Sequence, residues 1–175
     1  MSTPLLAHPA AIGTYPIADA AGALPLSVAE LSLVYDVLTP AACDLARTPW
    51  QRRLAVFWAD QLRAVHPPAS PADLADLGWQ CGVWTEQRGH VRRVIELART
   101  GYRYAVLSYD PLAPRAYLDV LDRAVAAYRP RPCTPASGDL RWVLPATGEE
   151  FERCRHHDVF VGGYGLCRYC VRWVG

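Results

Sequence analysis

The sequence predicts an α+β protein in which a mainly helical body is followed by a small β module at the C-terminal end. Helix-start signals recur through the first three quarters of the chain, and the apolar residues after them follow helical spacing. A Pro-, Ser- and Gly-rich stretch at residues 129–139 then precedes a segment with strand character and paired Cys and His residues. With 175 residues, 51% of them hydrophobic and 20% charged, the chain can bury a core of its own.

The predicted helices begin at capping signals. Residues 1–25 are rich in Ala, Pro and Gly and lack periodicity, which predicts an irregular N-terminal arm before the helical body at 26–129. Ser27 and Glu30 form a capping box, in which the hydroxyl accepts a hydrogen bond from a free backbone N–H and the glutamate reaches back. At three further starts a Thr or Ser precedes a proline, where the missing N–H costs nothing. These starts are Thr39-Pro40, Thr48-Pro49 and Ser70-Pro71, and Gln51 and Asp73 strengthen the last two.

Apolar spacing defines the elements of the body. Trp50, Leu54 and Trp58 fall on one stripe of the third expected helix, and Val91 and Ile95 fall on one stripe of the fifth. The segment YRYAVLS has strand character instead. The expected helices span about residues 27–38, 40–47, 49–65, 71–80, 85–100 and 112–128, and the expected strand spans Tyr102–Ser108.

Two pairs of metal-binding residues with the same two-residue gap lie within the last 22 residues. Cys154-Arg-His-His157 is followed, after nine residues, by Cys167-Arg-Tyr-Cys170. Zinc prefers four soft or borderline ligands at about 2.0–2.3 Å, and a site with four protein ligands is closed to substrate. The pattern therefore predicts a structural zinc ion held by Cys154, His157, Cys167 and Cys170. The alternative histidine ligand is His156, which would give a one-residue gap.

A linker is expected at 130–137 and the zinc-stabilised module at 138–175. Short strands are expected in this module at Leu140–Leu144, Glu150–Cys154, Val159–Val161 and Val171–Val174. Together with the two Cys/His pairs, residues 140–175 resemble zinc-ribbon modules, in which two knuckles on hairpins share one zinc ion. Such modules often bind polymerases or other proteins, so the resemblance implies RNA polymerase or another protein as a partner.

Cysteine usage and hydropathy bear on the location of the protein. Residues 1–26 lack the basic stretch and continuous apolar core of a secretory signal, so a reducing cytoplasm is expected and the clustered cysteines are interpreted as metal ligands. Cys43, Cys81 and Cys133 are scattered, and we expect them to be small buried apolar side chains. No apolar run reaches the roughly 18 residues that cross a bilayer, so no membrane partner is expected.

The basic residues are all arginines, and they are unevenly spread. An abundance of Ala, Pro, Gly and Arg indicates a GC-rich bacterial or phage genome. The net charge is +1, but residues 1–46 hold four acids and no arginine, whereas residues 47–175 hold 18 arginines against 13 acids. Five arginines and one glutamate lie between Arg88 and Arg103. This stretch suits a phosphate-bearing partner, and equally the solvent face of an ordinary helix.

Residues 49–108 resemble a winged-helix DNA-binding domain. Ser70–Gly78 is similar to its short second helix, His90–Gly101 to its recognition helix, and Tyr102–Ser108 to the strand that opens the wing. The resemblance implies that exposed arginines of the recognition helix contact phosphates and base edges. Residues 79–87 form a longer connection than the family uses, and no second wing strand is evident. The implied nucleic-acid-binding residues are Arg88, Arg92, Arg93 and Arg99.

The sequence contains no motif of a nucleotide-binding enzyme or a common hydrolase, so no enzymatic activity is expected. A zinc deaminase would need a glutamate beside the ligand histidine, whereas Asp158 follows His157. We therefore predict a small cytosolic bacterial or phage regulatory protein that binds nucleic acid or the transcription machinery. The alternative is a zinc-stabilised protein–protein adaptor or inhibitor without nucleic-acid affinity, which the acidic first 46 residues favour.

Overall fold

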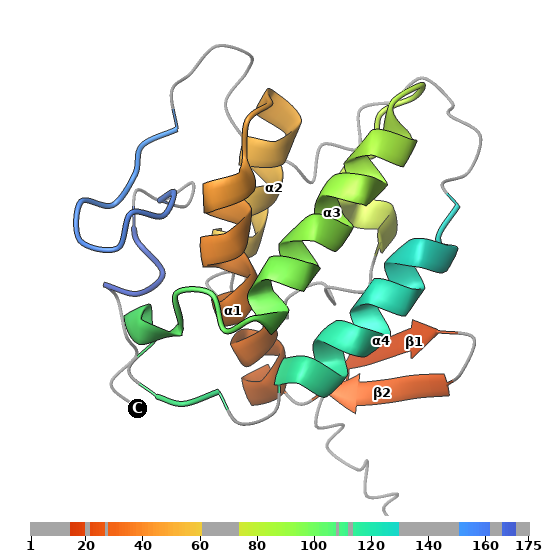
Figure 1. Ribbon diagram of the computed structural model, residues 1–175, viewed down its shortest axis with the longest axis horizontal. Coiled ribbons are helices and arrows are strands. Elements are labelled where there is room, and N and C mark those ends of the chain that lie inside the picture. Colours follow the sequence, from red (N-terminus) through yellow and green to blue (C-terminus); the bar gives the residue numbers. More distant parts are fainter. Residues whose placement is uncertain are drawn as a thin grey trace, which may run out of the picture.

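The described part of the chain is mainly helical. The computed structural model describes residues 15–19, 22–26, 28–60, 74–107, 109–111, 114–129, 151–161 and 166–170. These ranges contain four α-helices, two short 3-10 helices and one pair of strands (Figure 1). No helix within them is long and apolar enough to cross a membrane.

Helix α1 (Val28–Leu45) is the central element of the body. It contacts α2 (Pro49–Asp60), α3 (Trp84–Arg99) and α4 (Pro114–Ala127), and α3 also packs along α4. The middle and end of α1 are almost entirely buried, including Val34, Tyr35, Leu38, Ala42 and Cys43. The run from Val37 to Cys43 is buried and apolar apart from Thr39, and a helical stretch that is apolar all round belongs in the interior of a bundle.

A β-hairpin replaces part of the irregular arm that was expected at the N-terminal end. Strand β1 (Tyr15–Asp19) pairs antiparallel with β2 (Gly22–Leu26), with Tyr15 opposite Leu26 and Ile17 opposite Leu24. The hairpin contacts α4 through β1 and α1 through β2. Figure 1 shows it at the end of the bundle beside α4. Residues 1–14 lie outside the described ranges.

The expected helices 27–38 and 40–47 form one continuous helix, because Pro40 lies inside α1 and does not start a second helix. The Thr39 hydroxyl does not cap a new helix but donates to the carbonyl of Tyr35, one turn earlier, at 2.7 Å. Proline has no N–H to donate to the carbonyl of Asp36, so that carbonyl loses its helical partner. The Tyr169 hydroxyl donates to it instead, at 2.7 Å. A residue near the other end of the chain thus makes proline tolerable in the central helix.

The strand expected at Tyr102–Ser108 is wrong over the residues that the structure describes. This segment is a turn followed by a 3-10 helix, η2 (Tyr104–Val106). Gly101 and Arg103 both have positive φ angles, 78° and 55°, so the chain coils where the strand would begin. The Tyr104 hydroxyl then donates back to the carbonyl of Ala98 at 2.9 Å. The winged-helix resemblance therefore loses the strand that would open its wing.

The segment expected as a helix at 71–80 also differs from the prediction. Its described part contains only a 3-10 turn, η1 (Leu74–Leu77), followed by Gly78 with a φ of 61°. The Trp50 indole N–H lies within hydrogen-bonding distance of the carbonyls of Leu77 (3.2 Å) and Gly78 (2.9 Å). This long-range contact favours a compact turn over a full helix at this position.

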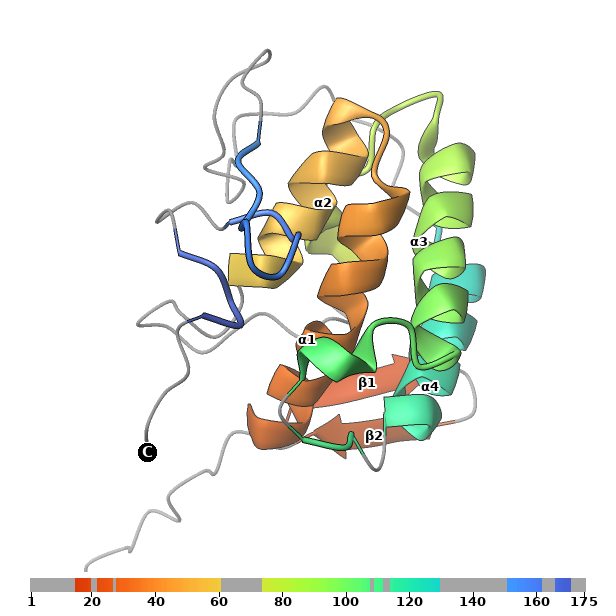
Figure 2. The same cartoon turned by 60° about the vertical axis from the view of Figure 1, so that its left-hand side comes forward.

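The C-terminal segment packs against the body and shares its core. Val159 and Phe160 are buried in the same apolar cluster as α1, together with Cys154, Cys167 and Tyr169. Figures 1 and 2 show residues 151–161 and 166–170 on the side of α1 and α2 that faces away from α4. In place of the expected strands around Cys154 and Val159–Val161 there is a single bridge between Arg153 and Phe160. The other two expected strands and the linker 130–137 lie outside the described residues.

His90 is a buried neutral side chain in the middle of the body. It is 1% exposed and lies edge-on to Trp50, with 6.2 Å between ring centroids. Burial, and then the nearby Arg93 charge, lower the pKa of His90 from its ordinary 6.5 to about 4. The folded protein therefore keeps His90 uncharged under conditions in which an unfolded chain would protonate it.

Replacement of His90 by leucine should reduce the sensitivity of the protein to acid. As pH falls from about 6.5 to about 4, the unfolded chain binds a proton that the folded protein excludes, so stability is lost across this window, by about 3 kcal/mol at most. Urea unfolding gives the free energy of unfolding of wild type and His90→Leu at pH 7 and at pH 4.5. The contribution of His90 is the amount by which the loss between the two pH values is larger in wild type than in His90→Leu. Equal losses in the two proteins would show that His90 does not contribute.

Candidate metal centre

Three cysteines and one histidine converge in the C-terminal segment. Cys154, His157, Cys167 and Cys170 place their ligand atoms within 4.8 Å of one another. The Nδ1 atom of His157 lies 3.7 Å from the sulfur of Cys154, 3.6 Å from that of Cys167 and 3.3 Å from that of Cys170. The sulfurs of Cys154 and Cys170 are 3.6 Å apart. These are the four residues that the sequence spacing singles out, and together they can hold a metal ion.

The separations match the edges of a small tetrahedron. For bonds of about 2.3 Å to sulfur and about 2.0 Å to nitrogen, tetrahedral geometry places two sulfurs about 3.8 Å apart and a sulfur and a nitrogen about 3.5 Å apart. The sulfurs of Cys154 and Cys170 are 3.6 Å apart, and the three nitrogen–sulfur distances are 3.3–3.7 Å. Four of the six edges therefore have tetrahedral lengths, and all four ligand atoms lie within 4.8 Å of one another, so a tetrahedral ion fits with small shifts of the ligands.

Local backbone hydrogen bonds form the first knuckle, residues 154–157, and the second knuckle, residues 167–170. The N–H of Asp158 donates to the carbonyl of Cys154 at 2.7 Å, and the N–H of Cys154 donates to the carbonyl of Val159 at 2.8 Å. Asp158 has a φ of 48°, which reverses the chain immediately after the histidine ligand. In the second knuckle the N–H of Cys170 donates to the carbonyl of Cys167 at 3.2 Å. Each two-residue gap thus closes on itself and turns both of its ligands to the same side.

The thiols at this centre show opposite tendencies to ionise. Burial acts to raise the pKa of Cys154, but hydrogen bonds from the backbone and side chain of His157 and the backbone of His156 lower it to about 6. Burial and the neighbouring Cys154 and Cys167 raise the pKa of Cys170 to about 11. One thiolate is therefore favoured, whereas adjacent thiolates repel one another. A bound cation would remove this repulsion and allow all three to ionise.

The second knuckle is anchored to α1 at Asp36. The side chain of Arg168 forms an ion pair with the Asp36 carboxylate and also donates to the carbonyl of Ser32 at 3.0 Å. Next to it, the Tyr169 hydroxyl donates to the Asp36 carbonyl that Pro40 leaves without a helical partner. The Tyr109 hydroxyl donates to the other carboxylate oxygen of Asp36 at 2.6 Å. Three segments far apart in the sequence therefore meet at one aspartate.

The first knuckle is anchored further along α1 and to the turn after α3. The N–H of Phe160 donates to the sulfur of Cys43 at 3.3 Å, and the guanidinium of Arg153 donates to the carbonyl of Cys43 at 3.3 Å. Arg103, in the positive-φ turn, donates to the carbonyls of His157 and Asp158. Both knuckles of the metal centre therefore contact the central helix α1, one at Asp36 and the other at Cys43.

The other cysteines have different environments. Cys43 is buried, and burial raises the pKa of its thiol to about 12, so it is an inert apolar side chain as expected. Cys81 does not fit that expectation, because it is exposed and disulfide-bonded, with its partner outside the described residues. Cys133 also lies outside them. His156, the alternative ligand, is exposed and is not among the four converging residues.

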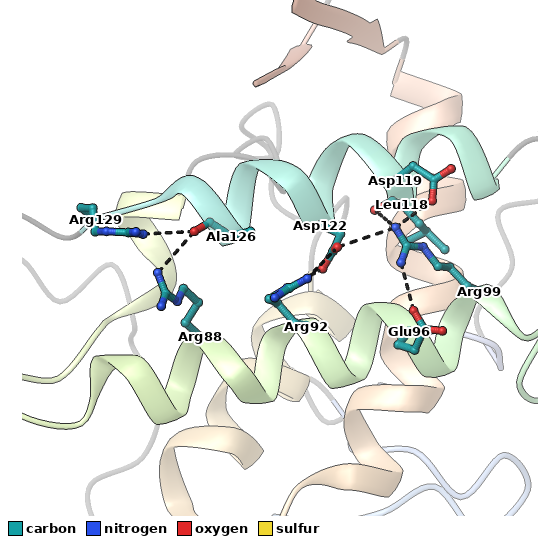
Figure 3. Close-up of polar contacts among 9 residues, drawn as sticks. All are labelled: Arg88, Arg92, Glu96, Arg99, Leu118, Asp119, Asp122, Ala126 and Arg129. Carbon is teal, nitrogen blue, oxygen red and sulfur yellow. Dashed lines mark hydrogen bonds and ion pairs between the residues drawn. The ribbon is translucent and has the colours of Figure 1, made fainter. Parts of the chain in front are cut away.

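The four arginines predicted to bind nucleic acid lie on α3, and three of them contact α4. Arg92 pairs with Asp122 at 2.8 Å, and Arg99 pairs with Asp119 at 2.7 Å and Glu96 at 3.0 Å. Arg88 donates to the carbonyl of Ala126 at 3.3 Å (Figure 3). Arg93 is exposed, and within the described ranges it has no ion-pair partner. The structure therefore places much of this positive charge in a seam that joins two helices.

The residues that anchor the knuckles were not singled out from the sequence. Asp36, Arg103, Arg153 and Tyr169 look like ordinary surface or core residues, because their partners lie far away in the chain. One signal was available, since a proline inside a long apolar helical pattern leaves a carbonyl that needs a distant donor.

Comparison with protein-family models, curated proteins and solved structures gives no match for this chain.

Proposed function

We propose that the protein is a zinc-stabilised adaptor that acts by binding another protein, without catalysis. The observation that carries this proposal is the set of four converging protein ligands, three cysteines and one histidine. Soft thiolates with one imidazole at tetrahedral separations favour zinc over harder cations such as Mg²⁺ or Ca²⁺. Four protein ligands leave no open position for a substrate or reactive water, which favours a structural role for the ion.

The surroundings of the centre support a scaffold role. Both knuckles are anchored to α1, through part-buried contacts to Asp36 and a buried contact to Cys43. Zinc would therefore fix the C-terminal segment on the helical body and create one continuous surface from two parts of the chain. Rigid presentation of such a surface is what an adaptor requires, because preorganisation lowers the cost of binding a partner.

The charges of α3 favour a protein partner over nucleic acid. A recognition helix needs free guanidinium groups to reach phosphates and base edges. Arg92 and Arg99 instead pair with carboxylates of α4, and any nucleic acid following α3 would meet Asp119, Asp122 and Glu96. The bacterial or phage origin and the cytosolic location expected from the sequence stay predictions.

The full-length protein should show little retention on single- and double-stranded DNA columns at low salt. The adaptor account predicts elution below physiological ionic strength, with an affinity that does not follow the steep salt dependence of phosphate neutralisation. Arg92→Ala should leave the elution unchanged, since Arg92 is engaged with Asp122. Tight retention that falls linearly with the logarithm of salt, and that Arg92→Ala and Arg93→Ala weaken, would instead establish the nucleic-acid function.

A further inference from the structure

The seam between α3 and α4 ends in two arginines that pair with no carboxylate of the described residues. Arg88 donates to the carbonyl of Ala126 at 3.3 Å, and Arg129 donates to the same carbonyl at 3.0 Å and to those of Ala127 and Tyr128. These acceptors are carbonyls at the C-terminal end of α4, whose partial negative charge suits cations. Neither arginine forms an ion pair with another residue of the described segments, so no carboxylate among them offsets the charge of this pair.

An indole ring orients these two guanidinium groups. Trp84, the first residue of α3, lies beneath Arg88, whose guanidinium carbon is 4.7 Å from the ring centroid, and Arg129 is 5.9 Å from the same ring. Stacking on an aromatic ring fixes the planar group, and the N–H groups that do not donate to the α4 carbonyls remain to form hydrogen bonds with an oxyanion. Arg129 is exposed, and Arg88 and Trp84 are half-buried, so the cluster can be reached from solvent.

The seam is basic at one end and contains carboxylates at the other, and this pattern limits which charged partners can bind along it. Arg99 lies among Glu96, Asp119 and Asp122 at the far end, whereas Arg88 and Arg129 lie together at the near end (Figure 3). A nucleic-acid strand needs a continuous basic track, because every nucleotide carries a phosphate. A short acidic peptide needs only the cationic end, since its carboxylates are confined to a few residues.

We propose that the cluster of Trp84, Arg88 and Arg129 is a docking site for an acidic segment of a partner protein. This inference rests on the proposed adaptor function and names the chemistry of its partner. Carboxylates of the segment would accept hydrogen bonds from the two guanidinium edges, in the bidentate geometry that arginine favours. The ion pairs Arg92–Asp122 and Arg99–Asp119 lie next to this site along the seam. Their carboxylates would repel an acidic segment, so the bound segment must not extend over them.

The test uses the full-length, zinc-loaded protein and four short fluorescent probes of equal length: a Glu/Asp peptide, its Gln/Asn counterpart, a Lys/Arg peptide and single-stranded DNA. Fluorescence anisotropy should show preferential binding of the Glu/Asp peptide, weakening with salt. Replacement of Arg88 and Arg129 together by glutamine should weaken that binding by about tenfold or more. The matched control replaces Arg53 of α2 and Arg115 of α4 by glutamine and should leave the affinity unchanged.

A second pair of variants guards against loss of folding. Arg88→Lys with Arg129→Lys keeps both charges but loses the planar fork, and should weaken binding severalfold while helix content and zinc content stay unchanged. Arg88→Glu with Arg129→Glu should reverse the preference toward a Lys/Arg peptide. Equal weakening by the control pair, or no preference for the Glu/Asp peptide, would overturn the docking site and leave the adaptor function standing. Preference for the DNA probe would overturn both.

Discussion

Replacement of Cys167 by serine is expected to abolish metal binding and to lower the stability of the whole protein. The sulfur of Cys167 is one of four converging ligand atoms, and serine cannot replace a thiolate ligand for zinc. Without the ion the two knuckles separate, and Val159, Phe160 and Tyr169 lose their support in the shared core. We expect a loss of about 5 kcal/mol, equivalent to roughly 10–20 °C in Tm for a chain of this size. Thermal unfolding with metal analysis measures both effects.

The adjacent histidines provide the matched control for this experiment. His157→Ala should lose zinc as Cys167→Ser does, because Nδ1 of His157 lies 3.3–3.7 Å from all three sulfurs. His156→Ala should keep its zinc and its Tm, because the exposed His156 is not part of the converging set. A strong chelator should lower the Tm of wild type and His156→Ala but not that of Cys167→Ser. If Cys167→Ser retained both metal and stability, the four-ligand centre would be wrong.

Replacement of Asp36 by alanine should have the second largest effect, although this residue lies far from the centre in sequence. The Asp36 side chain is 18% exposed and its partner Arg168 is 6% exposed, so the pair is largely removed from water. Removing one member of such a pair leaves a buried charge without compensation, which costs about 3–5 kcal/mol. Asp36→Ala also removes the acceptor of the Tyr109 hydroxyl. Urea unfolding of the zinc-loaded protein measures the loss.

Two further variants separate the contributions at Asp36. Tyr169→Phe removes only the hydroxyl that satisfies the Asp36 carbonyl, and should cost about 1–3 kcal/mol for an unsatisfied buried acceptor. Asp119→Ala removes a carboxylate that is 52% exposed and pairs with Arg99, and should cost less than about 1 kcal/mol. Equal losses for Asp36→Ala and Asp119→Ala would contradict the claim that Asp36 anchors the second knuckle.

Local signals predicted those parts of the structure that local chemistry decides. The start of α2 is an example, because Thr48 caps the N–H of Gln51 at 3.3 Å while the Gln51 side chain accepts from the N–H of Thr48 at 3.0 Å. The paired knuckles are another, since a two-residue gap positions two ligands on the same side of a turn whatever surrounds it. Mainly helical character also follows from the spacing of apolar residues, as in α3 with its buried Val91, Val94 and Ile95.

Predictions failed where a distant partner decides the outcome. Thr39-Pro40 has the chemistry of a helix start, yet α1 continues through it, because the Tyr169 hydroxyl donates to the Asp36 carbonyl that Pro40 leaves without a helical partner. YRYAVLS has the composition of a strand, but it forms a turn and a 3-10 helix. The positive φ angles of Gly101 and Arg103 turn the chain, and the Tyr104 hydroxyl donates back to the Ala98 carbonyl of α3. Likewise, a count of arginines predicts a basic face, whereas Asp119 and Asp122 on the next helix neutralise part of it.

Cobalt(II) substitution tests the central claim most directly, because the ion reports both the geometry and the ligands of its site. Titration of the reduced, metal-free protein should saturate at one equivalent per chain, with the intense visible bands of tetrahedral cobalt and a strong thiolate-to-cobalt absorption in the near ultraviolet. Zinc should displace the cobalt, and His157→Ala should weaken and shift the spectrum whereas His156→Ala should not. A weak octahedral spectrum, or no saturable uptake, would show that Cys154, His157, Cys167 and Cys170 do not form a tetrahedral metal centre.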